Sequence, residues 1–245
     1  MSLGQLSLWF LISLGVLLVA RRWMSDWLQR CLLLILRRAD WAVITYAVLL
    51  FPGVLLHEAS HWIVARVLGV RAGPIRLIPR VRPGGMLQLG SVEVESVDFL
   101  RSTLIGAAPL LAGVAALTAL VRLWPGIGVA WGLFDWTVPA ALRTVQTAAE
   151  APWFALWFYL AWAVSNTMLP SPADRRGWLT VLIVIVVLLG GSIYLGYGPQ
   201  ILRSVQDPLS LALRSMAGIF GLTIALDLLS SLPLMLLAAI LSGLR

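Results

Sequence analysis

Lysine is absent from this sequence, and cysteine and charged residues are scarce. The chain has one cysteine, Cys31, and all 18 of its basic residues are arginine. A single cysteine excludes an intramolecular disulfide framework and any metal site built from several thiolates, so histidine and carboxylate groups would have to hold a metal. Charged residues make up 12% of the chain and hydrophobic residues 60%. This composition is too apolar for a soluble domain with one hydrophobic core, and it predicts an integral membrane protein.

The net charge of +7 would suggest a nucleic-acid partner in a soluble protein. Here most of the arginines lie in short segments that flank apolar runs, where they are typical of membrane anchors and topology signals. We therefore expect the lipid bilayer as a partner and no nucleic acid.

A hydrocarbon core of ~30 Å needs ~20 apolar residues in a helix, and six stretches of the chain qualify or nearly qualify. They are Leu3 to Ala20, Trp41 to Val67, Leu100 to Val121, Pro152 to Leu169, Trp178 to Leu195 and Met216 to Leu241. The first lacks the marks of a cleaved signal, so we expect a permanent span. In the last, Pro233 should kink the helix. The sequence thus predicts an all-α polytopic membrane protein of about six transmembrane helices, organised as one membrane domain over residues 1–245.

The segments between these spans are expected to lie at the membrane surface. Arg21 to Asp40 combines tryptophans and an apolar run with five arginines, which predicts an interfacial helix, and Arg122 to Glu150 is also interfacial. Between the second and third spans, prolines and paired glycines separate short alternating runs. This pattern predicts a β-hairpin over about residues 73–95 that turns near Pro83 to Gly85. The alternative is a solvated connector without a partner.

The run His57-Glu58-Ala59-Ser60-His61 lies inside the second apolar stretch and contains both histidines of the chain. Positions i and i+4 of a helix share a face, so the two imidazoles can bind one ion. Glu58, on the same turn, can reach a water on that metal, which is the general-base role of this spacing in zinc peptidases. The alternative is a pair of interfacial histidines at a helix end.

A catalytic zinc usually holds three protein ligands and a water, so the third ligand must be a carboxylate here. The candidates are Glu93, Glu95, Asp98, Asp135, Glu150, Asp174, Asp207 and Asp227. Counting membrane crossings places Asp174 and Asn166 on the side of the histidines and Glu150 on the opposite side. Asp227 is the rival, because a carboxylate within a span is costly unless it is paired. It could instead bond an arginine, a serine or a backbone carbonyl between helices.

These motifs resemble the site-2 protease family of intramembrane zinc metalloproteases. That family carries His-Glu-x-x-His on one span and Asn-x-x-Pro-x-Pro-x-x-Asp-Gly near the end of a later, parallel span. The segment from Asn166 to Arg175 keeps the Asn to Asp distance, but both prolines stand one place later and Arg175 replaces the glycine. Gly106 to Pro109 partly matches the family's Gly-Pro motif. The resemblance covers roughly Phe51 to Arg176, in a compact form without a PDZ-like domain.

The resemblance implies a role for each residue of the site. His57, His61 and Asp174 would bind Zn²⁺, Glu58 would activate the water, and Asn166 would hold the substrate carbonyl or its oxyanion. Asn166 could instead be an interhelical hydrogen-bond partner.

The function implied is that of an intramembrane endopeptidase that cuts a peptide bond within or near a transmembrane helix of a substrate protein. Residues 41–177 would then form the catalytic core, with the hairpin associated with the membrane. Residues 1–40 would supply the first span and interfacial helix, and residues 178–245 the C-terminal spans. The family also implies a bacterial or archaeal cytoplasmic membrane, with the active site towards the cytoplasm.

Three alternatives use the same residues differently. A non-catalytic receptor or scaffold could keep the fold with a structural metal, although such a site has no use for Glu58. Another zinc-peptidase lineage would take Glu150 as its third ligand. An aspartyl dyad of Asp174 and Asp227 would leave the histidine motif unexplained.

Overall fold

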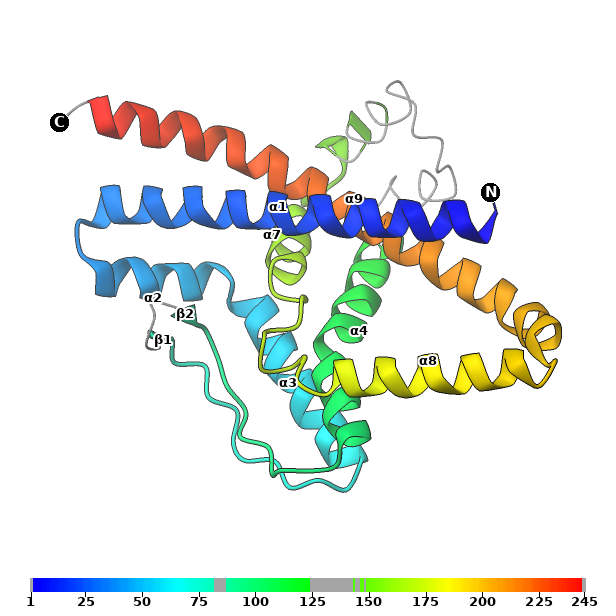
Figure 1. Ribbon diagram of the computed structural model, residues 1–245. Coiled ribbons are helices and arrows are strands. Elements are labelled where there is room, and N and C mark those ends of the chain that lie inside the picture. Colours follow the sequence, from blue (N-terminus) through cyan, green and yellow to red (C-terminus); the bar gives the residue numbers. More distant parts are fainter. Residues whose placement is uncertain (1, 82–86, 124–142, 144–145, 148, 244–245) are drawn as a thin grey trace.

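The computed structural model describes residues 2–81, 87–123, 143, 146–147 and 149–243, and this part of the chain is mostly helical (Figure 1). Its elements in chain order are α1 (Leu3–Leu36), α2 (Ala39–Leu49), α3 (Phe51–Val67), β1 (Arg80–Val81), β2 (Leu87–Gln88), α4 (Phe99–Leu123), α7 (Phe154–Ser165), α8 (Trp178–Tyr194) and α9 (Gly198–Gly243).

Helix α1 is one continuous helix of 34 residues. Ser2 starts it with a capping box, because its hydroxyl accepts from the Gln5 backbone N–H while the Gln5 side chain accepts from the Ser2 backbone. It ends at Arg37, which has a left-handed backbone with φ of 56°. The predicted boundary at Ala20 is therefore wrong. Residues 21–36 contain no glycine or proline, so nothing there stops the helix.

The predicted span from Trp41 to Val67 is broken rather than straight. Helices α2 and α3 meet at Leu50 and are bent by 71°. Pro52 lies in the first turn of α3, where a backbone N–H would have no helical partner, so its absence costs nothing. Because it lacks this N–H, Pro52 cannot make the hydrogen bond that would continue α2 through this point. The bend separates a helix that packs on α1 from the helix that carries both histidines.

Helices α3, α4 and α7 pack against one another and form the centre of the molecule (Figure 1). Helix α4 agrees closely with the predicted third span, and its start is fixed by Asp98, whose carboxylate accepts from the backbone N–H groups of Leu100 and Arg101. Helix α7 is shorter than the predicted span from Pro152 to Leu169. It ends at Ser165, so the segment that leads to Asp174 begins inside the packed region.

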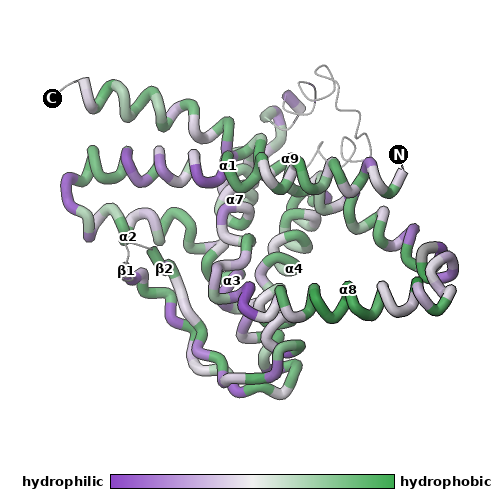
Figure 2. The backbone as a smooth tube through the Cα atoms, in the orientation of Figure 1, coloured by the Kyte–Doolittle hydropathy of each residue, from purple (hydrophilic) through white to green (hydrophobic). Residues whose placement is uncertain are grey.

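The C-terminal helices form the outer part of the structure. Helix α8 has no buried residue, and it extends away from the central helices (Figure 1). Most of it is strongly hydrophobic, and a paler stretch follows towards its C-terminal end (Figure 2). Helix α9 begins at Gly198, well before the predicted Met216, and continues as helix through Pro208 and Pro233. Its C-terminal part lies beside α1.

Length and composition identify three helices that can cross a membrane: α1, α4 and α9. The bent pair of α2 and α3 makes a fourth if it counts as one span, and α7 and α8 are apolar helices of 12 and 17 residues. The chain is thus helical with membrane-spanning segments, as predicted. The described residues do not establish the predicted count of six.

A two-stranded antiparallel sheet lies between α3 and α4, with Arg80 opposite Gln88 and Val81 opposite Leu87. Isolated bridges continue the pairing outward at Arg76 with Ser91 and at Ala72 with Val94. The predicted turn near Pro83 to Gly85 lies outside the described residues, as does most of the predicted interfacial segment from Arg122 to Glu150.

Candidate metal centre

The two histidines project from one face of α3, and each ring is anchored by a backbone carbonyl of another element. His57 Nδ1 lies 2.7 Å from the carbonyl oxygen of Thr167, just beyond α7. His61 Nδ1 lies 2.8 Å from the carbonyl oxygen of Ile105 in α4. A carbonyl can only accept, so each Nδ1 must carry the proton. Each Nε2 of the neutral ring is then free to bind a metal.

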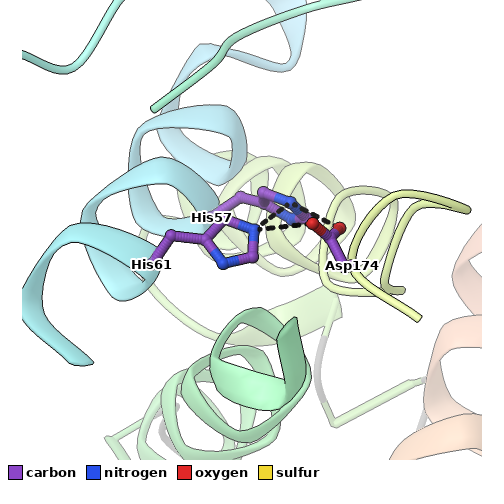
Figure 3. Close-up of side chains that lie close together, drawn as sticks. All are labelled: His57, His61 and Asp174. Carbon is purple, nitrogen blue, oxygen red and sulfur yellow. Dashed lines mark hydrogen bonds and ion pairs between the residues drawn. The ribbon is translucent and has the colours of Figure 1, made fainter. Parts of the chain in front are cut away.

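Asp174 meets the histidines from the loop between α7 and α8 (Figure 3). One carboxylate oxygen lies 3.3 Å from His61 Nε2, and the other lies 3.7 Å from His57 Nε2. The side chains of His57, His61 and Asp174 are 15%, 9% and 15% exposed, so the cluster is largely enclosed but still reachable.

The distances suit a tetrahedral ion. Two nitrogens bound to zinc at the usual bond length lie about 3.3 Å apart. The His57 and His61 Nε2 atoms are 3.2 Å apart, and one ligand atom from each of the three residues lies within 4.8 Å of the others. Two imidazoles and one carboxylate are also a common donor set for a catalytic zinc. Within the described residues, the structure thus brings together the three predicted ligands.

The charge state of Asp174 suits the same role. Burial raises the pKa of its carboxyl group, but contacts with the His57 and His61 rings, when Nε2 carries a proton, and with Ser171 outweigh burial and hold this pKa well below its ordinary range. The Ser171 backbone N–H donates to the carboxylate over 2.7 Å. The group is therefore ionised at neutral pH, which is the form that binds a metal.

Glu58 is buried, with 7% of its surface exposed, on the turn between the two histidines. It lies against the segment that follows β2: a Cβ atom added to Gly90 would come within 2.8 Å of Glu58 Cγ and 2.9 Å of Oε1. A residue larger than glycine would therefore press on the carboxylate. The backbone near Gly90 borders the predicted general base.

Gly106 of α4 allows the Asp174 loop to approach. A Cβ atom at this position would collide with the backbone carbonyl of Asp174. Ile105, the preceding residue, supplies the carbonyl that orients His61. One turn of α4 therefore supports two of the three ligands. The sequence showed Gly106 only as part of a partial motif match, and backbone carbonyls leave no mark in a sequence at all.

Asn166 is buried but makes no described contact with the three ligands. Its amide nitrogen donates to Asp227 Oδ1 over 2.9 Å and to the Trp162 carbonyl over 3.0 Å. Asp227, the rival third ligand, is fully buried in α9. The structure therefore pairs the rival with Asn166 and leaves Asp174 with the histidines.

Two other candidate carboxylates have partners of their own. Glu150 is exposed and accepts from Gln146 over 3.1 Å. Glu93 pairs with Arg76 over 2.8 Å in the two-stranded region. Neither lies in the cluster of His57, His61 and Asp174.

Comparisons with known proteins add no family, relative or related fold to this description. No protein-family model, no curated protein and no solved structure matches the chain.

Proposed function

We propose that this chain is a zinc-dependent intramembrane endopeptidase that hydrolyses a peptide bond within or near a transmembrane helix of another membrane protein. One observation carries the proposal: two Nε2 atoms, with their Nδ1 atoms committed to carbonyls, converge with one carboxylate. A catalytic zinc site requires nitrogen and oxygen atoms at these distances that are free to bind the ion. The resemblance of the two motifs to the site-2 protease family supports the same reading.

In this proposal the residues divide the work between binding and proton transfer. Zinc, when bound by His57, His61 and Asp174, lowers the pKa of a bound water and polarises the peptide carbonyl. Glu58 accepts a proton from the attacking water and later delivers it to the departing amine nitrogen. Its burial keeps bulk water away from this transfer. Asn166 as the group that holds the substrate carbonyl stays a prediction.

The substrate class follows from where the site lies. Two of its ligands come from α3 and the third from the loop that follows α7, all within a membrane domain, so we expect a substrate to approach through the bilayer. We infer that the bent α2–α3 pair, α7 and α8 cross the membrane together with α1, α4 and α9, which gives six spans. The paired region around β1 and β2 would then form a membrane-associated hairpin beside Glu58.

We also infer that the site faces the cytoplasm. The resemblance to the site-2 protease family carries this inference; the arginines in the loop between α3 and α4 and at the helix ends beside it agree with an inner side, whereas the five arginines between Arg21 and Arg38 would then face outward. The arginines in and beside the α3–α4 loop include Arg66, Arg71, Arg76, Arg80, Arg82 and Arg101. Arg80→Cys should resist impermeant thiol reagents added to sealed cells, and labelling from outside would reverse the orientation.

Metal analysis combined with a cleavage assay tests the proposed function. Purified protein should contain about one zinc per chain, a chelator should remove both the zinc and the cleavage of a single-span reporter in vesicles, and added Zn²⁺ should restore both. Cleavage that persists in metal-free protein would refute the mechanism. Bound zinc without cleavage of any reporter would favour the receptor or scaffold instead.

A further inference from the structure

A buried polar pair joins α7 to α9 outside the metal cluster. Asn166 is 4% exposed and Asp227 is 0% exposed. The Asn166 amide nitrogen faces two acceptors, Asp227 Oδ1 and the carbonyl of Trp162. Only the nitrogen side of an amide can face two acceptors, so the orientation of Asn166 is fixed. Both of its N–H groups are used within the protein.

This pair is one residue away from the carbonyl that orients His57. Helix α7 ends at Ser165, and the carbonyl that accepts from His57 Nδ1 belongs to Thr167. Beyond a helix end, the helical hydrogen bonds no longer hold every carbonyl in place. The backbone N–H groups of Asn166 and Thr167 still bond to carbonyls of α7, and the Asn166 side chain adds a tie from this point to Asp227 of α9.

Asp227 also interacts electrostatically with Arg21 of α1, and α1 packs along α9. The carboxylate therefore lies at a junction of α1, α7 and α9. Burying an ionisable residue such as Asp227 within a membrane domain costs free energy, so we expect this carboxylate to have a function beyond a single hydrogen bond.

We propose that Asp227 is a positioning residue of the metal centre: through Asn166 it fixes the Thr167 carbonyl, and this carbonyl fixes the ring of His57. The inference rests on the proposed metal site. It assigns Asp227 no contact with metal or substrate. It also gives Asn166 a supporting role, since neither of its N–H groups is free to hold a substrate carbonyl while the pair is made.

The test measures metal binding rather than proteolysis. Full-length metal-free protein is titrated with Co²⁺, and the dissociation constant and d–d absorption bands are recorded for wild type and variants. Asp227→Leu, which removes the acceptor, should weaken Co²⁺ binding about 10- to 100-fold and alter the bands, as loss of an outer partner of a metal ligand does. Asp227→Asn keeps an acceptor oxygen and should stay within about threefold of wild type.

Thr223→Val is the matched control. Thr223 is also fully buried on α9, one turn before Asp227, but among the residues that the structure describes its hydroxyl bonds only to the Ile219 carbonyl of its own helix. Co²⁺ binding by this variant should equal that of wild type. If Asp227→Leu does not fold, Asp227→Ala supplies the same comparison.

A double-mutant cycle tests the route through Asn166. Asn166→Leu should weaken Co²⁺ binding about as much as Asp227→Leu, and the double variant should be no worse than either single variant. Binding by Asp227→Leu within twofold of wild type, or losses that multiply in the double variant, would overturn the inference while leaving the metal site intact. Failure of wild type to bind Co²⁺ would overturn the proposed function and this inference with it.

Discussion

The central helices α3, α4 and α7 and the outer helix α8 are all apolar, but they differ in which residues they bury. Where α3, α4 and α7 meet, buried positions include Glu58, His61 and Asn166, and glycines such as Gly106 bring backbones together. Helix α8 has no buried residue, and its apolar side chains point outward along its length. Gly190 within it has no atom within 4 Å of where a Cβ would stand.

The difference shows what hydrophobicity means in a membrane protein. Lipid is as apolar as leucine, so a very apolar helix gains little by packing on its neighbours. Small and polar residues let helices approach closely and bond to one another, so they mark the packed interior. The comparison predicts that substitutions have large effects in the centre and small effects in α8.

The largest effect is expected from loss of a ligand. Asp174→Ala should reduce zinc content to near background, because only the two histidines would remain, and His57→Ala should do the same. The control is Asp207→Ala, which removes an exposed carboxylate from the outer part of α9 and should retain full zinc. Metal analysis that found full zinc in Asp174→Ala but little in Asp227→Ala would reverse the choice of third ligand.

A smaller effect is expected when the support of a ligand is disturbed. Gly106→Val should weaken zinc binding at least about tenfold, because the new side chain displaces the backbone of Asp174. Gly190→Val makes the same chemical change in α8 and should leave zinc binding unchanged. Competition with a chromophoric chelator measures both. Equal zinc affinities in Gly106→Val and Gly190→Val would contradict the proposal that substitutions act more strongly in the centre than in α8.

A smaller change still is expected at the general base. Gly90→Ala should leave zinc content unchanged and lower the cleavage rate several-fold, because its methyl group would press on Glu58. Gly73→Ala, in the same paired region, places its methyl group no closer than 3.5 Å to its neighbours and should cleave normally. A Gly90→Ala protein with normal cleavage would show that this segment does not constrain Glu58.

The sequence predicted the cluster of His57, His61 and Asp174 better than the helix limits. The spacing of His57 and His61 places them on one helical face whatever surrounds them, and counting crossings brought Asp174 to the same side. The motifs alone could not show which carbonyls orient the rings. Those contacts depend on how α4 and α7 pack. Because every residue has a backbone carbonyl, the sequence cannot show which one will be in reach.

Helix limits were harder to predict because polar residues and helix breakers act differently within a packed membrane domain. Arg21 and Arg22 suggested the end of a span, but arginine is a good helix former and α1 continues through both. Pro52 bends the stretch from Trp41 to Val67 at the start of α3, whereas Pro208 and Pro233 are accommodated inside α9. Proline fixes local backbone angles, and its neighbours decide whether the helix breaks.

The most direct test of the account is Glu58→Gln, measured for zinc and for cleavage in the same preparation. Glutamine keeps the size and position of the side chain but cannot accept the proton of the attacking water. We predict zinc content equal to wild type and cleavage of a single-span reporter in vesicles reduced by at least about a thousandfold. Cleavage near the wild-type rate, with zinc bound, would contradict the proposal that Glu58 is the general base of a metalloprotease.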